Sequence, residues 1–316
     1  MHRFRFIAFL VFATFGFTSF AAYTPYLDSI FIRLFTGNAS YIDEKWANAS
    51  LLVSYIDDNK PTVFYVHGFS ENVTSTSLQT VVSAYQDRGD HNVMAVDYRD
   101  LAALQYPFSA AASADIGKVI AAALDRMVRA GLDSKKLVIV GHSMGCQVIG
   151  FTARNVHFTI QRIIGLDPAG PLFNIFIPHL SSTDAVAVII IHTDKGGYGN
   201  INPSGTVNFY PNCGHRIQPG CPILILPLSN EDYCSHHRSW RFYAESIKNE
   251  HAFVGIKCQN KIKFRFGMCN QTDKVIMGYA TPQNATGVYY LWTEAQSPFG
   301  VGDNGTVCTN LHCIFC

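Results

Sequence analysis

The sequence has few charged side chains and no cluster of them. Asp, Glu, Lys and Arg make up 15% of its 316 residues, and the formal net charge is +1. Nucleic-acid binding depends on clustered Lys and Arg, so we expect no nucleic-acid partner. Internal repeats, low-complexity linkers and charge blocks are also missing. The hydrophobic fraction of 48% is enough for a large core, in one large domain or two ordinary ones.

The sequence has one long apolar run, and it lies at the N-terminus. Arg3 and Arg5 precede it, the run extends over Phe6–Phe17, and small residues follow up to Ala21. This pattern is typical of a secretory signal peptide, which we expect over residues 1–21. The run is shorter than the roughly 20 residues that a membrane-spanning helix needs. The sequence therefore predicts secretion to the extracellular space, no transmembrane segment, and a mature chain over residues 22–316.

Nine cysteines and six glycosylation sequons agree with an exported protein. The odd number of cysteines means that at least one thiol is free or forms an intermolecular bond. Cys146 is our candidate for the free thiol, because it lies on a helix that we expect to be buried. The sequons are at Asn38, Asn48, Asn72, Asn270, Asn284 and Asn304.

The middle of the chain alternates between apolar runs and segments of helical periodicity. Helical spacing of apolar residues occurs over 110–130 and 144–155, and short apolar runs occur at 62–67, 92–97, 137–140, 162–166 and 185–192. This alternation predicts a parallel sheet covered by helices on both faces. After about residue 255 we expect antiparallel strands that close one edge of the sheet, on the evidence of Phe264, Phe266, Tyr279, Tyr289, Tyr290 and Trp292.

Ser143 lies in the motif Gly141-His142-Ser143-Met144-Gly145, between a predicted strand and a predicted helix. A strand that turns at once into a helix brings two backbones close together, and the flanking glycines supply the space. The turn would hold the serine above the sheet, with the amide of Met144 beside it. This context predicts a nucleophile rather than a small residue that only fills a turn.

A serine nucleophile needs a histidine that takes its proton and an acid that orients the histidine. Asp167 and Asp194 both follow predicted strands downstream of Ser143, and topology favours Asp167 only mildly. Among the downstream histidines, His236 and His237 stand out because Cys234 precedes them next to a helical segment, and their spacing does not choose between the two. The other candidates for the base are His179, His192, His215 and His251.

The strand at 62–67 runs into His67-Gly68-Phe69 at a loop. Amides in such a loop can point at a developing oxyanion without side chains in the way. We therefore expect the amides of Phe69 and Met144 to form an oxyanion hole.

These segments together resemble the pancreatic lipase family, and most of all its short secreted insect-type branch, which includes phospholipase A1-like proteins. The resemblance covers roughly residues 60 to 302 and is carried by VFYVHGF, VMAVDYRDLA, KLVIVGHSMG, IIGLDPAGPLF, IIIHTD, FYPNCG with QPGC, CSHHRSWRFYAESI, and MGY with TGVYYLWTEAQSPFGVG. It implies an α/β-hydrolase fold with a mostly parallel central sheet and helices on both faces. It also implies Ser143, Asp167 and His236 as the triad, and the Phe69 amide in the oxyanion hole.

The chain departs from the family pattern in several places. Family members commonly have GHSLGAH where this chain has GHSMGCQ, and Cys213 stands where glycine is more usual. The chain ends soon after PFGVG, so we expect no C-terminal β-sandwich domain. The resemblance implies no metal and no organic cofactor.

The resemblance also places a lid between Cys221 and Cys234, and only 12 residues separate these cysteines. Short loops resemble those of phospholipase A1 enzymes, so we expect cleavage of the sn-1 ester of phospholipids at a membrane or lipoprotein surface. The alternatives are a triacylglycerol or galactolipid lipase, and a non-catalytic lipid-binding or yolk-type storage protein.

The lid is rich in aliphatic side chains, at Ile223, Leu224, Ile225, Leu226 and Leu228. They could insert into a lipid surface or pack onto the core. Cys221–Cys234 and Cys258–Cys269 are expected local disulfides, whereas Cys213, Cys308, Cys313 and Cys316 could not be paired. The sequence makes no prediction about the oligomeric state.

Overall fold

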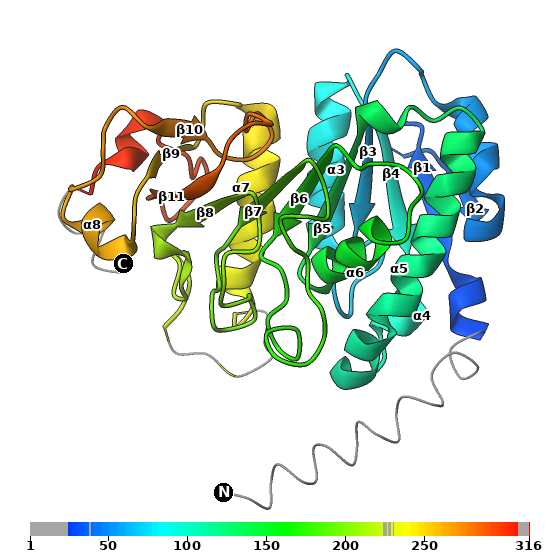
Figure 1. Ribbon diagram of the computed structural model, residues 1–316, viewed down its shortest axis with the longest axis horizontal. Helices are drawn as coiled ribbons and strands as arrows, with labels where there is room; N and C mark the ends of the chain where they lie inside the picture. The colour runs from blue at the N-terminus through cyan, green and yellow to red at the C-terminus, as the bar shows by residue number, and fades with distance from the viewer. Residues whose placement is uncertain (1–24, 38, 224–225, 227–228, 230, 309–315) are drawn as a thin grey trace, which may run out of the picture.

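The computed structural model describes residues 25–316 apart from 38, 224–225, 227–228, 230 and 309–315 (Figure 1). The expected signal peptide, residues 1–21, lies outside the described residues. None of the helices in the described part of the chain combines the length and the apolarity that crossing a bilayer needs.

An eleven-stranded sheet forms the centre of the molecule, in the order β10-β9-β11-β8-β7-β6-β5-β3-β4-β1-β2. Its middle is parallel and consists of β3 (Thr62–Val66), β4 (Asn92–Asp97), β5 (Leu137–His142), β6 (Arg162–Leu166), β7 (Ala187–Ile191), β8 (Val207–Pro211) and β11 (Gly287–Leu291). Antiparallel strands extend it at both edges: β1 (Phe31–Phe35) and β2 (Tyr41–Lys45) at one, β9 (Val254–Lys257) and β10 (Lys274–Ile276) at the other.

Helices cover both faces of the sheet (Figure 1). The long α5 (Tyr106–Arg129) and α6 (Met144–Ala153) pack on one face, and α3 (Thr76–Arg88) and α7 (Cys234–Lys248) pack on the other. Two further named α-helices, α4 (Arg99–Ala102) and α8 (Lys261–Arg265), are short. The named 3-10 helices are η1 (Trp46–Tyr55), η2 (Ser134–Lys136), η3 (Asn212–Gly214) and η4 (Asp303–Thr306).

The sequence explains why the central strands and helices form where they do. All residues of β3, β4, β7 and β8 are buried, as expected of parallel strands with helices on both faces. Helix α5 has a proline in its first turn, where the missing amide costs no helical hydrogen bond. Helix α3 ends at Gly89, whose φ of 76° is accessible to glycine at little cost.

The apolar runs and helical segments of the sequence correspond to β3 to β7, α5 and α6, with small shifts of their ends. The expectation of antiparallel strands in the aromatic C-terminal region was only partly right. β9 and β10 are antiparallel, and β11, which contains Tyr289 and Tyr290, is antiparallel to β9 but parallel to β8. The connection from β8 to β11 includes α7, and a crossover of this length permits a parallel return. Phe264 lies in α8 rather than in a strand, since Asn260 caps that helix by accepting the amide of Lys263.

The carboxyl ends of parallel strands meet at one edge of a sheet. The residues that follow β3, β5, β6 and β7 are therefore neighbours in space, although they are far apart in the sequence. The loops at this edge carry most of the candidate site residues.

Candidate active site

Ser143 occupies a sharp turn between β5 and α6. Its backbone has φ 54° and ψ −123°, a conformation that residues other than glycine rarely adopt. A Cβ on Gly145 would lie 2.2 Å from the carbonyl oxygen of Val66, and a Cβ on Gly141 would lie 2.5 Å from Cδ1 of Ile149. The two glycines of the motif are therefore required for α6 to begin this close to the sheet.

The loop after β3 approaches the same turn. A Cβ on Gly68 would lie 3.1 Å from Cβ of Ser143, and the buried ring of His67 contacts the Gly68 carbonyl oxygen through Nδ1 at 3.0 Å. The amides of Phe69 and Met144 donate no backbone hydrogen bond to another described residue. Two unpaired amides beside a nucleophile are what an oxyanion hole requires.

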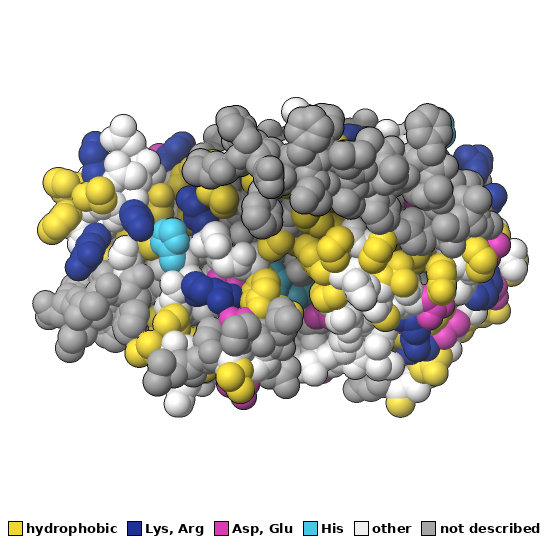
Figure 2. All heavy atoms as spheres, turned by 90° about the horizontal axis from the view of Figure 1, so that it is seen from below, with side chains coloured by type: hydrophobic (Ala, Val, Ile, Leu, Met, Phe, Trp, Pro, Cys, Tyr) yellow, Lys and Arg dark blue, Asp and Glu magenta, His cyan; other side chains and the backbone are white. Residues whose placement is uncertain are grey.

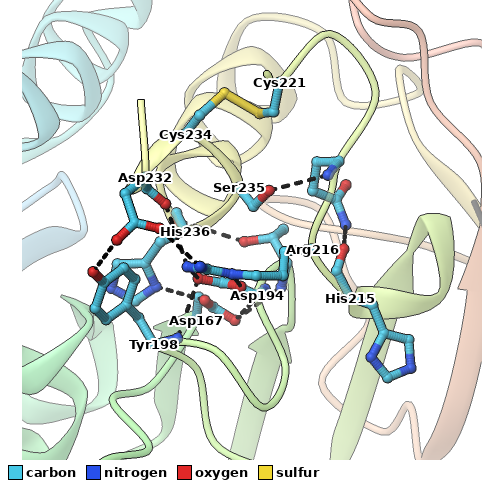
Figure 3. Close-up of polar contacts among 12 residues, drawn as sticks. Asp167, Asp194, Tyr198, His215, Arg216, Cys221, Asp232, Cys234, Ser235 and His236 are labelled. Atoms are coloured by element: carbon cyan, nitrogen blue, oxygen red, sulfur yellow. Dashed lines mark hydrogen bonds and ion pairs between the residues drawn. A yellow bond between two sulfur atoms is a disulfide. The ribbon is translucent and has the colours of Figure 1, made fainter. Parts of the chain in front are cut away.

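Asp167 follows β6 and reaches His236 in the first turn of α7. Its Oδ2 lies 2.6 Å from Nδ1 of His236, and both side chains are buried. The other oxygen, Oδ1, accepts the amides of Thr193 at 2.8 Å and Asp194 at 3.2 Å (Figure 3). The acid is thus fixed on both sides and holds the imidazole in one orientation. Between the two acids that the sequence left open, it is Asp167 that contacts this histidine.

The histidines near the site differ in their pKa. Burial opposes the protonation of His236, but the hydrogen bond and charge of Asp167, together with the charge of Asp194, outweigh it and raise the pKa of His236. Burial and the charges of His142 and His236 lower the pKa of His237 to about 3. His236 is therefore the better proton acceptor of the adjacent pair.

The remaining histidine candidates have other surroundings. Burial lowers the pKa of His192 to about 4, and its Nε2 lies 3.0 Å from Oδ1 of Asn208. The ring of His179 contacts the carbonyl oxygen of the following residue. His215 lies 3.2 Å from Nζ of Lys261, and His251 is exposed. None of these four lines the cavity that contains Ser143.

Asp194, the other candidate for the triad acid, belongs to an ion-pair network beside the triad (Figure 3). Arg216 donates to both of its oxygens at 2.6 Å and also donates to Asp232 at 2.8 Å. Tyr198 donates its hydroxyl to the second oxygen of Asp232. Burial and the nearby charge of Asp167 raise the pKa of Asp194 in spite of Arg216. The network connects the loops after β7 and β8 to the start of α7, and so supports the position of the histidine.

Asp167, Asp194 and His236 also present ligand atoms within 4.8 Å of one another. Such spacing alone would fit a metal ion. However, both oxygens of Asp167 already accept hydrogen bonds, and the guanidinium of Arg216 occupies both oxygens of Asp194. A carboxylate–imidazole pair therefore explains the arrangement better than a cation site does.

Glu71 is a half-buried acid that no motif in the sequence indicated. Its carboxylate accepts the amide of Gly68 and the hydroxyl of Ser77, both at 2.6 Å, and lies 3.3 Å from Nδ1 of His142. Burial favours the neutral acid, but His142, Ser77 and the Gly68 amide outweigh it and lower the pKa of Glu71. Glu71 thus joins the loop after β3, helix α3 and the turn before Ser143. The only indication of this role in the sequence is the position of the carboxylate, three residues after Gly68.

Ser143 and His236 line one cavity of about 840 Å³. Figure 2 views the molecule from the side of this cavity and shows a histidine side chain in a hollow among apolar side chains. The lining combines apolar and polar groups, and it includes Phe69, Glu71, Thr76, Ser77, Tyr106, Pro171, Tyr198, Tyr233, His237, Trp240 and Arg241. The cavity is large enough for one acyl chain together with part of a polar headgroup.

The segment between Cys221 and Cys234, which we call the lid, is tethered beside His236. The two cysteines form a disulfide with a Cα–Cα distance of 5.7 Å, and Cys234 begins α7. Ile223 and Leu226 are 72% and 78% exposed, which is contrary to packing of these two side chains onto the core. Leu224, Ile225 and Leu228 lie outside the described residues.

The other cysteines complete the pattern. Cys258 and Cys269 form the second expected bridge, and Cys213 pairs with Cys316, a link that the sequence did not predict. Cys146 is free and buried in α6, where we expected the unpaired thiol. Cys313 lies outside the described residues.

Most of the sequons lie on the surface. Asn48, Asn270, Asn284 and Asn304 are exposed, and Asn72 is half-buried. Asn38 lies outside the described residues. The four exposed asparagines remain predicted glycosylation sites.

Comparison with known proteins agrees with this geometry. The sequence model of the Lipase family matches residues 34–299. This chain belongs to the lipase family. Among its relatives in the family, Lipase member H-B of Xenopus laevis is 35% identical over 226 residues, which cover 70% of this chain and 49% of the relative. Phospholipase A1 of Vespa crabro is 32% identical over 257 residues, which cover 76% of this chain and 83% of the relative.

A second wasp protein, Phospholipase A1 of Vespula squamosa, is 33% identical over 254 residues, again covering 76% of this chain and 83% of the relative. The lipase-family chain thus spans about half the length of the amphibian relative and most of the length of the wasp relatives. The mostly parallel sheet, the strand–serine–helix turn and the acid after β6 give it the α/β-hydrolase fold.

Proposed function

We propose that this lipase-family chain is a secreted serine carboxylester hydrolase that releases the sn-1 fatty acid of glycerophospholipids. The observation that carries the proposal is the contact between Asp167 and His236 in a cavity that Ser143 also lines. A carboxylate-held imidazole that shares a cavity with a serine at a strained turn is an arrangement for acyl transfer.

In the proposed reaction, Ser143 Oγ attacks the ester carbonyl carbon while its proton passes to the His236 nitrogen that Asp167 leaves free. The oxyanion of the tetrahedral intermediate accepts hydrogen bonds from the amides of Phe69 and Met144. His236 then gives the proton to the leaving alcohol of the lysolipid. A water molecule, deprotonated by the same imidazole, attacks the acyl-enzyme and releases the fatty acid.

The proposed phospholipid preference rests on the openness of the site. The lid has only 12 residues between its cysteines, so a polar headgroup need not be excluded from the cavity. The exposed Ile223 and Leu226 supply apolar contact with a lipid surface. Two of the relatives are named phospholipase A1, and their matches cover most of both chains.

The proposal also includes the cellular context and the domain organisation. The N-terminal leader and the three disulfides between described cysteines agree with an oxidising, extracellular environment. We propose that residues 1–21 are removed and that residues 22–316 form one domain, because all strands named above belong to a single sheet.

The test uses position-labelled lipids. Purified protein is incubated with phosphatidylcholine, phosphatidylserine, a galactolipid and a mixed-chain triacylglycerol, each carrying different fatty acids at its positions, and the released acid is identified by mass spectrometry. We expect release from position sn-1 of the phospholipids, and none by the Ser143→Ala variant. Faster release from the triacylglycerol or the galactolipid would favour the neutral-lipid alternative. Binding without release would favour the non-catalytic one.

A further inference from the structure

One wall of the catalytic cavity is polar and is not used by the triad. It is formed by Trp240 and Arg241 of α7 and by Thr76 and Ser77 in the first turn of α3. An acyl chain would not need such groups. The wall is therefore a candidate for contact with another part of the substrate.

Arg241 brings a positive charge to this wall. Other buried or half-buried arginines have partners: Arg33 and Arg216 pair with Asp43 and Asp194. Arg162 and Arg238 instead donate to backbone carbonyl oxygens. Arg241 forms no ion pair with a residue that the structure describes, and burial is what lowers its pKa. Its Cζ lies 5.0 Å from the centroid of the Trp240 ring, an arrangement that holds a guanidinium in place.

Trp240 adds an unpaired donor. Its side chain is only 4% exposed, and its indole Nε1 has no hydrogen-bond partner among the described residues. A buried N–H without an acceptor costs free energy. The N–H itself is shielded from solvent, so it would pair with a ligand oxygen in the cavity only after the ring turns.

Helix α3 presents its positive end to the same wall. The helix has 13 residues, no acidic residue in its first turn and no side-chain cap, so its first amides favour a negative ligand. Among the described residues that line the cavity, Glu71 is the acid, and its oxygens already accept hydrogen bonds from Gly68, Ser77 and His142. The wall thus offers donors, and the oxygens of the neighbouring carboxylate are already occupied.

We propose that Arg241 and Trp240, with the first turn of α3, bind the phosphodiester of the substrate and so make the enzyme select phospholipids. This inference rests on the proposed function. In a glycerophospholipid the phosphate and the scissile sn-1 ester sit on one glycerol, so a phosphate at this wall leaves the ester within reach of Ser143. A triacylglycerol or a diacylglycerol offers no anion to these donors. Arg241 is then a specificity-determining residue, since charged hydrogen bonds to phosphate are among the strong ones.

The first test compares substrates. For wild type and Arg241→Gln we would measure kcat/KM on phosphatidylcholine and on diacylglycerol of the same acyl chains, in the same detergent micelles. We expect the phospholipid-to-diacylglycerol ratio to fall about tenfold or more in Arg241→Gln, to recover in part in Arg241→Lys, and to stay unchanged in the control Arg265→Gln, which alters an exposed arginine of α8. Equal loss on both lipids would overturn the inference.

The second test measures binding without lipid cleavage. Hydrolysis of a soluble short-chain ester is followed with sn-glycerol 3-phosphate or inorganic phosphate as competitor. We expect glycerol phosphate to inhibit wild type, and to inhibit Arg241→Gln and Trp240→Phe more weakly. Equal inhibition of all three, or stronger inhibition by inorganic phosphate than by glycerol phosphate, would overturn the assignment to a lipid headgroup.

The two tests separate this inference from the proposed function. A wild type that cleaves only neutral lipids would contradict phospholipase activity, and the competition experiment would still report on the phosphate site. A wild type that prefers phospholipid, and keeps that preference in Arg241→Gln, would contradict the phosphate site alone.

Discussion

Asp167 and His236 meet at 2.6 Å although they are 69 positions apart in the chain. The acid follows β6 and the imidazole lies in the first turn of α7, directly after the disulfide that closes the lid. Because two backbone amides hold the far oxygen of Asp167, the pair cannot easily rotate. The base is thus oriented by the sheet and by the lid tether together.

Replacing Asp167 with Asn should lower kcat on a soluble ester by about three to four orders of magnitude, the loss seen when a triad acid is neutralised. The amide would no longer hold the imidazole in the correct tautomer. A matched control is Asp184→Asn, since Asp184 is another buried acid, paired with Arg154 outside the cavity. Comparable loss of kcat in both variants would point to general destabilisation.

The pH profile of kcat/KM should reflect the raised pKa of His236. The base must be neutral to take the serine proton, so activity should rise with pH and reach half its maximum above pH 6.5, the ordinary pKa of histidine. Since the charge of Asp194 contributes to the shift, Asp194→Asn should move the midpoint to lower pH. A wild-type midpoint at or below 6.5 would be at odds with the Asp167–His236 pair.

The two local disulfides should differ in their effect on catalysis. Each closes a loop of similar length, with sequence separations of 13 and 11, so removing either should cost about 3 kcal/mol of stability. Cys221→Ser/Cys234→Ser should also lower kcat, because the bridge ends two residues before His236. Cys258→Ser/Cys269→Ser should leave kcat unchanged at a temperature where both variants are folded. Equal kcat in the two variants would contradict a role for the Cys221–Cys234 disulfide in positioning His236.

The exposed lid residues should matter for lipid surfaces only. Ile223→Ser/Leu226→Ser should weaken vesicle binding and lower activity on vesicles at least several-fold, because burial of each large side chain contributes about 1.5–3 kcal/mol when complete. Activity on a soluble ester should be spared. The control is Leu51→Ser/Val186→Ser, which alters two other exposed aliphatic side chains that do not line the cavity. Vesicle activity that falls equally in both pairs would contradict a role for the lid.

The sequence predicted the parallel middle of the sheet because its strands are apolar on both faces and leave little ambiguity. It did not predict β1, whose five residues are interrupted by Arg33, or β2, which is mostly polar and forms the exposed edge of the sheet. β11 was expected to be antiparallel, but it is parallel to β8 and antiparallel only to β9. Strand direction depends on the path of the long connection through α7 and not on the strand residues, so the sequence did not indicate it.

The candidate site was predictable where residues are adjacent in the sequence, and less so elsewhere. The Ser143 turn is a local motif, whereas the choice of Asp167 and His236 came from the family resemblance and is matched by their contact in the structure. Glu71, Arg216 and Arg241 were missed because their roles depend on partners in other loops. No local pattern marks an acid that accepts three hydrogen bonds or an arginine that lacks an acid.

The most direct measurement is a crystal structure of the protein after reaction with an alkyl phosphonate ester, which mimics the tetrahedral intermediate. We expect phosphorus bonded to Ser143 Oγ, the phosphoryl oxygen within hydrogen-bond distance of the amides of Phe69 and Met144, and the His236 imidazole beside the leaving-group position. An unmodified Ser143, or a phosphoryl oxygen directed away from both amides, would contradict the proposed mechanism.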